Sequence, residues 1–170
     1  MLIEPNHGEE QTLESGSRQA HWEGVYTTKG ENEVSWFQDN PAPSLELIEA
    51  VGATPETAII DIGGGASRLV DSLLARGFRA LSVLDLSGAA LGAAKSRLGA
   101  QAEKANWIVA DVTLWEPTEV YDIWHDRAAF HFLTECRAAI MMAGHRQLNW
   151  PIRPMSSSDD MDTNLVVVWQ

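Results

Sequence analysis

The middle of the chain alternates short apolar runs with amphipathic stretches of helical period. The stretches between the runs repeat their apolar residues every three or four positions, which is typical of helices that bury one face. Strands that alternate with helices in this way favour right-handed βαβ units. The pattern therefore predicts an α/β fold, a Rossmann-like and mostly parallel sheet with flanking helices. The runs that predict its strands are residues 58–62, 79–86, 106–111 and 121–126.

Polar and glycine residues mark the expected ends of these helices. Ser44, Ser67 and Ser87 are positioned as N-caps, and Gly52, Gly77 and Gly99 follow the last apolar position of each helix. A further helical pattern follows the fourth strand, over residues 127–144.

The two ends of the chain differ from this middle part. Residues 1–18 are polar, acidic and aperiodic, and they predict a mobile tail. Residues 19–135 form the expected α/β domain, and 136–170 an atypical C-terminal tail. Within that tail, residues 165–170 could add one more strand. The C-terminal strands of the sheet are therefore expected to be incomplete, which leaves an unpaired edge and predicts low stability or a need for a partner.

Composition narrows the classes of partner. The chain has 170 residues, enough for one domain, and its formal net charge is -12. That charge disfavours nucleic acid and anionic membranes as partners. One cysteine, Cys136, excludes an intramolecular disulfide, and the N-terminal sequence has no signal-peptide pattern. We therefore expect a cytoplasmic protein with neither a nucleic-acid nor a membrane partner, of undetermined oligomeric state.

The stretch "DIGGGAS" follows the first predicted strand, where open α/β sheets bind ligands. Gly63 and Gly65 allow a turn that side chains would forbid, close to a ligand. Arg68 stands where the dinucleotide pattern requires its third glycine, so that pattern fails. Asp61 would repel a pyrophosphate but would attract a positively charged ligand. S-adenosylmethionine (SAM) is such a ligand, whereas a nicotinamide-dependent oxidoreductase is disfavoured.

Two further carboxylates follow the next two predicted strands. Asp85 lies about 20 residues after the glycine turn, the offset of a ribose-binding acid. Asp111 could accept a hydrogen bond from an adenine amino group, and the backbone of Val112 could donate one to the ring. Any single aspartate of this kind is more often a helix cap or a solvated turn residue. Three of them at neighbouring strand ends predict one nucleoside pocket.

The segment from about Trp22 to Leu133 resembles the class I SAM-dependent methyltransferases. "DIGGGAS" is similar to their motif I, although Ser67 replaces the usual third glycine. "VLDLS", "ADVT" and "YDIWHDRAAFHFL" resemble the segments at strands two, three and four. "HWEGVYTTKGENEVSWFQ" resembles a piece that folds over SAM in small bacterial and methyltransferase-like protein-lysine enzymes. The resemblance implies a cofactor site that includes Trp22, Tyr26, Trp36, Gly63, Asp85, Leu86, Asp111, Val112 and Arg127. The argument from the glycine turn adds Asp61 and Gly65 to it.

The expected function is methyl transfer from SAM to a small-molecule or protein acceptor. A catalytically impaired SAM-binding remnant that lacks the C-terminal substrate half is the alternative. No catalytic residue can be named, since His125, Asp126 and His131 each have a simpler structural reading. The scattered histidines and the acidic stretch at 156–162 do not predict a metal site.

Overall fold

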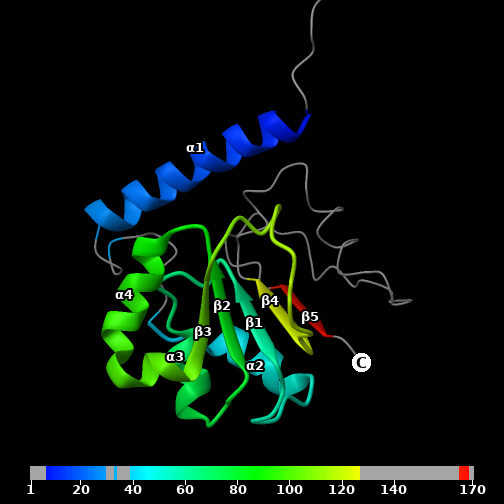
Figure 1. The fold of residues 1–170 in the computed structure, drawn as a ribbon. Coiled ribbons are helices and arrows are strands. Elements are labelled where there is room, and N and C mark those ends of the chain that lie inside the picture. The colour runs from blue at the N-terminus through cyan, green and yellow to red at the C-terminus, as the bar shows by residue number, and fades with distance from the viewer. Residues whose placement is uncertain (1–6, 30–32, 34–38, 127–164, 169–170) are drawn as a thin grey trace, which may run out of the picture.

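The computed structural model describes residues 7–29, 33, 39–126 and 165–168 (Figure 1). The helix expected at 127–144 lies outside these residues. The elements in chain order are the helices α1 (His7–Thr28) and α2 (Ala42–Ala50), β1 (Ile59–Ile62), α3 (Leu69–Ala75), β2 (Leu81–Asp85), α4 (Gly88–Leu98), a 3-10 helix η2 (Gly99–Lys104), β3 (Ala105–Val109), β4 (Ile123–Asp126) and β5 (Leu165–Val168).

The strands form one sheet in the order β3-β2-β1-β4-β5. The first four strands are parallel, and β5 pairs antiparallel with β4. The fold is therefore the Rossmann-like, mostly parallel sheet that the sequence predicts. The expected strand near the C-terminus also forms, over 165–168, and it occupies the edge beside β4.

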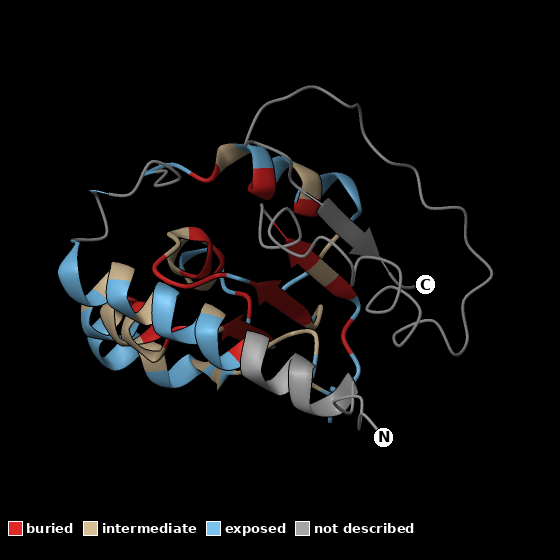
Figure 2. Cartoon of the chain, turned by 90° about the horizontal axis from the view of Figure 1, so that it is seen from above, coloured by how far each residue is buried: buried red, intermediate tan, exposed pale blue. Residues whose placement is uncertain are grey.

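The central strands of the sheet are largely buried (Figure 2). Each face of the sheet carries its own apolar cluster. The helices α2, α3 and α4 pack on one face through Leu45, Ile48, Leu69, Val70, Leu73 and Leu91. Ile60, Ile62, Leu84 and Tyr121 are buried on the other face, with Trp115 and Trp124 packed against them. Strands buried on both faces explain why β1 and β2 read as continuous apolar runs.

The expected start of α4 and the expected end of α3 are present. Ser87 caps α4 by accepting a hydrogen bond from the N–H of Ala90. Gly77 follows α3 with φ 88°, and Phe78 donates back to Leu73, the pattern of a Schellman end. The capping expectation for Ser44 is wrong. The helix α2 begins two residues earlier, so Ser44 lies inside it and is buried.

The N-terminal segment is not the tail that its composition indicates. The helix α1 begins at His7 and includes most of the expected tail at 1–18. It packs against α4 and lies across one end of the sheet (Figure 1). Across the described ranges, no helix combines the length and the apolar character that crossing a membrane requires.

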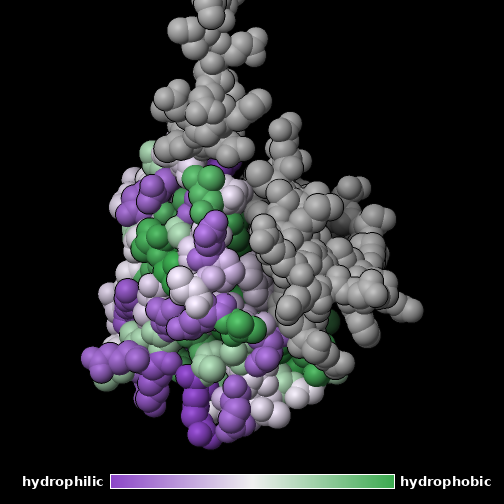
Figure 3. Space-filling model, turned by 45° about the vertical axis from the view of Figure 1, so that its right-hand side comes forward, coloured by the Kyte–Doolittle hydropathy of each residue, from purple (hydrophilic) through white to green (hydrophobic). Residues whose placement is uncertain are grey.

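The surface of the described part is mixed rather than uniformly polar. On the face shown in Figure 3, hydrophobic side chains lie in small patches between hydrophilic ones. Leu114 and Val120, in the segment between β3 and β4, are exposed.

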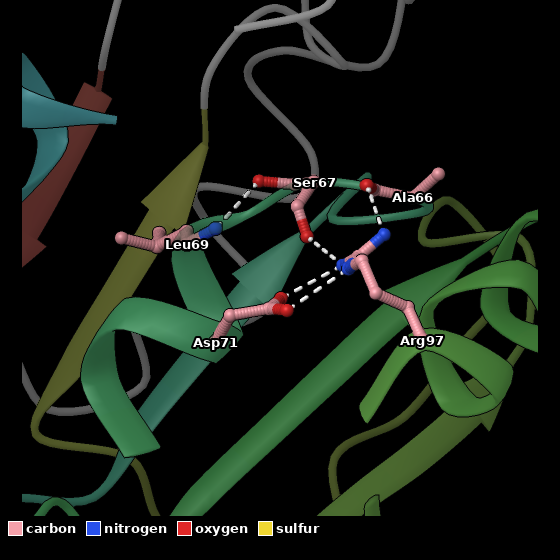
Figure 4. Close-up of polar contacts among 5 residues, drawn as sticks. All are labelled: Ala66, Ser67, Leu69, Asp71 and Arg97. Carbon is pink, nitrogen blue, oxygen red and sulfur yellow. Dashed lines mark hydrogen bonds and ion pairs between the residues drawn. The ribbon is translucent and has the colours of Figure 1, made fainter. Parts of the chain in front are cut away.

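Arg97 on α4 joins two helices and the turn between β1 and α3 (Figure 4). Its guanidinium donates to both carboxylate oxygens of Asp71 on α3, at 2.9 and 2.7 Å. It also donates to the carbonyl oxygens of Ala66 and Ser67, at 3.1 and 2.8 Å. The Ser67 hydroxyl in turn accepts from the N–H of Leu69. One partly buried side chain therefore fixes the end of the glycine turn.

We expect Arg97→Met to lower the free energy of unfolding by about 2–3 kcal/mol, because a charge-assisted network is lost and its acceptors remain. Arg79→Met is the matched control. Arg79 pairs with Glu56, and both side chains are exposed, so its loss is expected to change stability by less than about 1 kcal/mol. Urea unfolding of both variants measures the difference, and equal effects would contradict this role for Arg97.

Candidate functional site

The glycine turn follows β1 at the carboxyl end of the parallel strands. Gly63 and Gly65 have φ values of 67° and 37°, so both adopt the left-handed backbone that the sequence predicts. The N–H groups of Gly63 and Gly64 both donate to the carbonyl oxygen of Leu84 on β2, at 2.7 and 3.2 Å. The turn is therefore folded over the ends of β1 and β2.

Two carboxylates lie directly beneath this turn. A Cβ atom on Gly64 would come within 2.6 Å of Asp61 Oδ2, and one on Gly65 within 2.7 Å of Asp85 Oδ2. Carboxylates so close to the backbone leave no room for a side chain at either position. Packing thus requires Gly64 as well, a glycine for which the sequence offered no reason.

Asp61 is buried, with 5% of its surface exposed. It lies one residue before the end of β1 and is in register with His125 on β4. His125 Nδ1 and Asp61 Oδ1 are 2.7 Å apart, and His125 Nε2 lies 2.9 Å from the Ser44 hydroxyl. His125 is therefore hydrogen-bonded within the core, which is the structural role that the sequence allowed. Asp61 Oδ2 has no hydrogen-bond partner among the described residues.

Asp85 is the last residue of β2 and is also buried. Its Oδ1 accepts from the N–H of Ser87 at 2.8 Å. Burial raises the pKa of Asp85 to about 6, and the neighbouring negative charge of Asp61 adds to the rise, against the opposing hydrogen bond from Ser87. The site therefore holds two close carboxylates, one of which ionises only near neutral pH.

Asp111 lies two residues beyond the end of β3 and contacts α1. Thr113 donates to its Oδ1 through both N–H and hydroxyl, and Arg18 donates to its Oδ2 at 2.8 Å. Burial alone would raise the pKa of Asp111, but hydrogen bonds from Ser15, Thr113 and Arg18 outweigh it and lower the pKa to about 2. Four donors fill the roughly four acceptor positions of a carboxylate.

Glu23 joins α1 to the N-terminus of α4. Its carboxylate accepts from the hydroxyl of Ser87 at 2.7 Å and from the N–H of Ala89 at 3.2 Å. These hydrogen bonds, the one from Ser87 first, lower the pKa of Glu23. A negative charge at a helix N-terminus is favourable, so this contact holds α1 beside Asp85.

The other expected site residues fall into three groups. Trp22 and Tyr26 lie half-buried on α1, while Leu86 and Val112 follow β2 and β3 and are also half-buried. Val112 packs on the aromatic cluster of the second sheet face. Trp36 and Arg127 lie outside the described residues. The role of these residues in cofactor binding therefore remains a prediction. Asp61, Gly63, Gly65 and Asp85, by contrast, do lie together at the glycine turn.

Sequence reasoning missed Arg18, Glu23 and Ser44. Arg18 and Glu23 stand in a mostly polar stretch, and their partners lie 93 and 64 residues further along the chain. Ser44 had the local pattern of a cap, which hid its buried contact. In the described part of the chain, no group of three or more histidine, cysteine or acidic residues could hold a metal ion.

No protein-family model matches the chain, and no curated protein matches it in sequence. Solved structures do resemble it. One is a SAM-dependent methyltransferase from Geobacter sulfurreducens in complex with S-adenosyl-L-homocysteine, with a TM-score of 0.56 and 18% identity, covering 72% of this chain and 50% of that one. YjhP from E. coli has a TM-score of 0.56 and 18% identity, covering 72% and 51%.

A candidate SAM-dependent methyltransferase from Methanococcus maripaludis has a TM-score of 0.54 and 22% identity, covering 62% of this chain and 49% of that one. The chain thus spans about half the length of these structures. Its fold is that of the SAM-dependent methyltransferases.

Proposed function

We propose that this chain binds SAM and transfers its methyl group to a small-molecule or protein acceptor. The observation that carries the proposal is the pair of buried carboxylates, Asp61 and Asp85, packed under a glycine turn. Two neighbouring negative charges in a site of low polarity favour a cationic ligand and disfavour a phosphate. Asp61 Oδ2, which has no hydrogen-bond partner among the described residues, has the same preference.

The strand order supports one orientation of bound SAM along the carboxyl end of the sheet. Because β3, β2 and β1 are neighbours, Asp111, Asp85 and Asp61 follow one another along the carboxyl end of the sheet. Asp111 would face the adenine, Asp85 the ribose hydroxyls, and Asp61 the amino-acid end. Trp22 and Tyr26 on α1, together with Leu86 and Val112, would complete the nucleoside side.

When bound, SAM supplies an activated methyl group whose leaving sulfur becomes a neutral thioether. Such a transfer depends chiefly on alignment of the acceptor, the methyl carbon and the sulfur. The described residues contribute by holding the cofactor: the glycine turn admits it closely, and the carboxylates balance its charge. No described side chain is assigned the role of a base.

Isothermal titration calorimetry with SAM, S-adenosylhomocysteine and NAD tests the proposal. We expect both sulfur compounds to bind and NAD to fail, because its pyrophosphate would meet the two carboxylates. Methyl transfer is then sought with radiolabelled SAM on panels of small molecules and proteins. Binding of NAD without any response to the sulfur compounds would reject the proposal.

Asp85→Asn is expected to stabilise the ligand-free protein and to weaken S-adenosylhomocysteine binding. The raised pKa of Asp85, about 6, means that its contribution to stability is present at low pH and is lost as the pH rises through 6. At pH 7.5 the variant should therefore unfold at a higher temperature than the wild type, and the difference should shrink toward pH 5. Binding should weaken by about 1.5–3 kcal/mol, because a charged acceptor of ribose hydrogen bonds is lost.

Thermal unfolding and calorimetry over that pH range measure both quantities. Glu103→Gln serves as the control, since Glu103 is an exposed carboxylate on η2, before the start of β3. If Asp85→Asn were less stable than the wild type at pH 7.5, burial of the Asp85 carboxylate would not destabilise the protein.

Arg18→Gln is expected to strengthen S-adenosylhomocysteine binding by about threefold to tenfold. In the structure, four hydrogen bonds occupy Asp111, so an adenine amino group must displace one of its donors. Removal of the Arg18 guanidinium frees an acceptor position. The exposed change Arg79→Gln is the matched control. Weaker binding by Arg18→Gln alone would show that Arg18 supports the site rather than competes for it.

A further inference from the structure

A buried chain of polar side chains connects α2, β4 and β1. The hydroxyl of Ser44 lies 2.9 Å from His125 Nε2, and His125 Nδ1 lies 2.7 Å from Asp61 Oδ1. The exposed fractions of Ser44, His125 and Asp61 are 1%, 2% and 5%. Buried polar side chains are usually hydrogen-bonded, and here each of the three is bonded to the next.

The order serine, histidine, aspartate is that of a hydrolytic triad, but burial excludes this use. A nucleophilic hydroxyl must reach a substrate carbonyl. The Ser44 hydroxyl instead lies within the core between α2 and the sheet, on the face covered by the apolar residues of α2 and α3. The chain of contacts therefore acts on Asp61 and not on a substrate.

The contact with His125 determines how the Asp61 carboxylate is turned. A carboxylate oxygen accepts hydrogen bonds, so this contact favours the tautomer of His125 that carries its proton on Nδ1. The ring is itself held at its other nitrogen by Ser44. Oδ1 is then fixed toward β4, and Oδ2 is fixed on the opposite side, against the backbone of Gly64.

We infer that Ser44 and His125 are positioning residues for the cofactor: they hold the charge of Asp61 beneath the glycine turn, where it attracts the ammonium group of the amino-acid end. This inference rests on the proposed function. The strand order places Asp61 beyond Asp85, on the side away from Asp111, and so under the part of the ligand that follows the ribose. Since Oδ2 is buried, the attraction is a charge effect across the turn and not a hydrogen bond to the ligand.

Two ligands distinguish this role from a merely structural one. S-adenosylhomocysteine carries the ammonium group, whereas 5′-methylthioadenosine has the same nucleoside and sulfur without the amino acid. A substitution that only loosens the fold weakens the binding of both ligands by the same factor. A substitution that displaces the charge of Asp61 weakens the binding of S-adenosylhomocysteine alone.

The test compares His125→Leu with His125→Asn by calorimetry of the full chain with both ligands. Asparagine places an amide nitrogen where histidine has Nδ1 and can still donate to Asp61, whereas leucine cannot. We expect His125→Leu to reduce the preference for S-adenosylhomocysteine over 5′-methylthioadenosine about tenfold, and His125→Asn to keep it within about threefold. Asp61→Asn, which removes the charge and keeps the shape, gives the full size of the effect.

Ser44→Ala provides a second measurement if His125→Leu fails to fold, and it should reduce the same preference by about threefold. An unchanged preference in Ser44→Ala and His125→Leu would overturn the inference and leave the proposed function intact. A wild-type protein that binds neither ligand would overturn the proposed function first.

Discussion

Two buried carboxylates side by side, Asp61 and Asp85, are the constraint around which this end of the molecule is organised. They come together because β1 and β2 are parallel neighbours that place residues of the same face at the same edge. The backbone that leaves β1 must then cross directly over them. Only glycine fits where it does so, at Gly64 and Gly65, which lie within contact of the two carboxylates.

The surrounding structure offsets the unfavourable burial of these charges in different ways. Asp61 is bonded to His125 from β4, and Asp85 is bonded to the N–H of Ser87 at the start of α4. Neither arrangement brings a described lysine or arginine to the pair. Two arginines form ion pairs with other carboxylates: Arg97 with Asp71, and Arg18 with Asp111. In the proposed function, the cationic ligand supplies the positive charge that this pair lacks among the described residues.

Local signals sufficed for much of this structure. Apolar runs gave the four parallel strands, and Ser87 and Gly77 marked helix ends because caps depend on residues next to them in sequence. The positions of Asp61, Asp85 and Asp111 at or near the ends of β1, β2 and β3 followed from the apolar runs that precede them. What local signals could not give was any contact made at a distance. The first part of α1 is polar and aperiodic in sequence, so it resembled a tail. Ser44 has a capping pattern but contacts His125, 81 residues away.

The same distance has a consequence for how the protein is made. Arg18 leaves the ribosome 93 residues before its partner Asp111, and Glu23 leaves 64 residues before Ser87. Each βα pair of the sheet can assemble from neighbouring segments as it emerges, whereas α1 must wait until β2, α4 and β3 exist. During that interval its polar surface keeps it compatible with water. The contacts of α1 with Ser87 and Asp111 can therefore form only after β1, β2 and β3 have been synthesised.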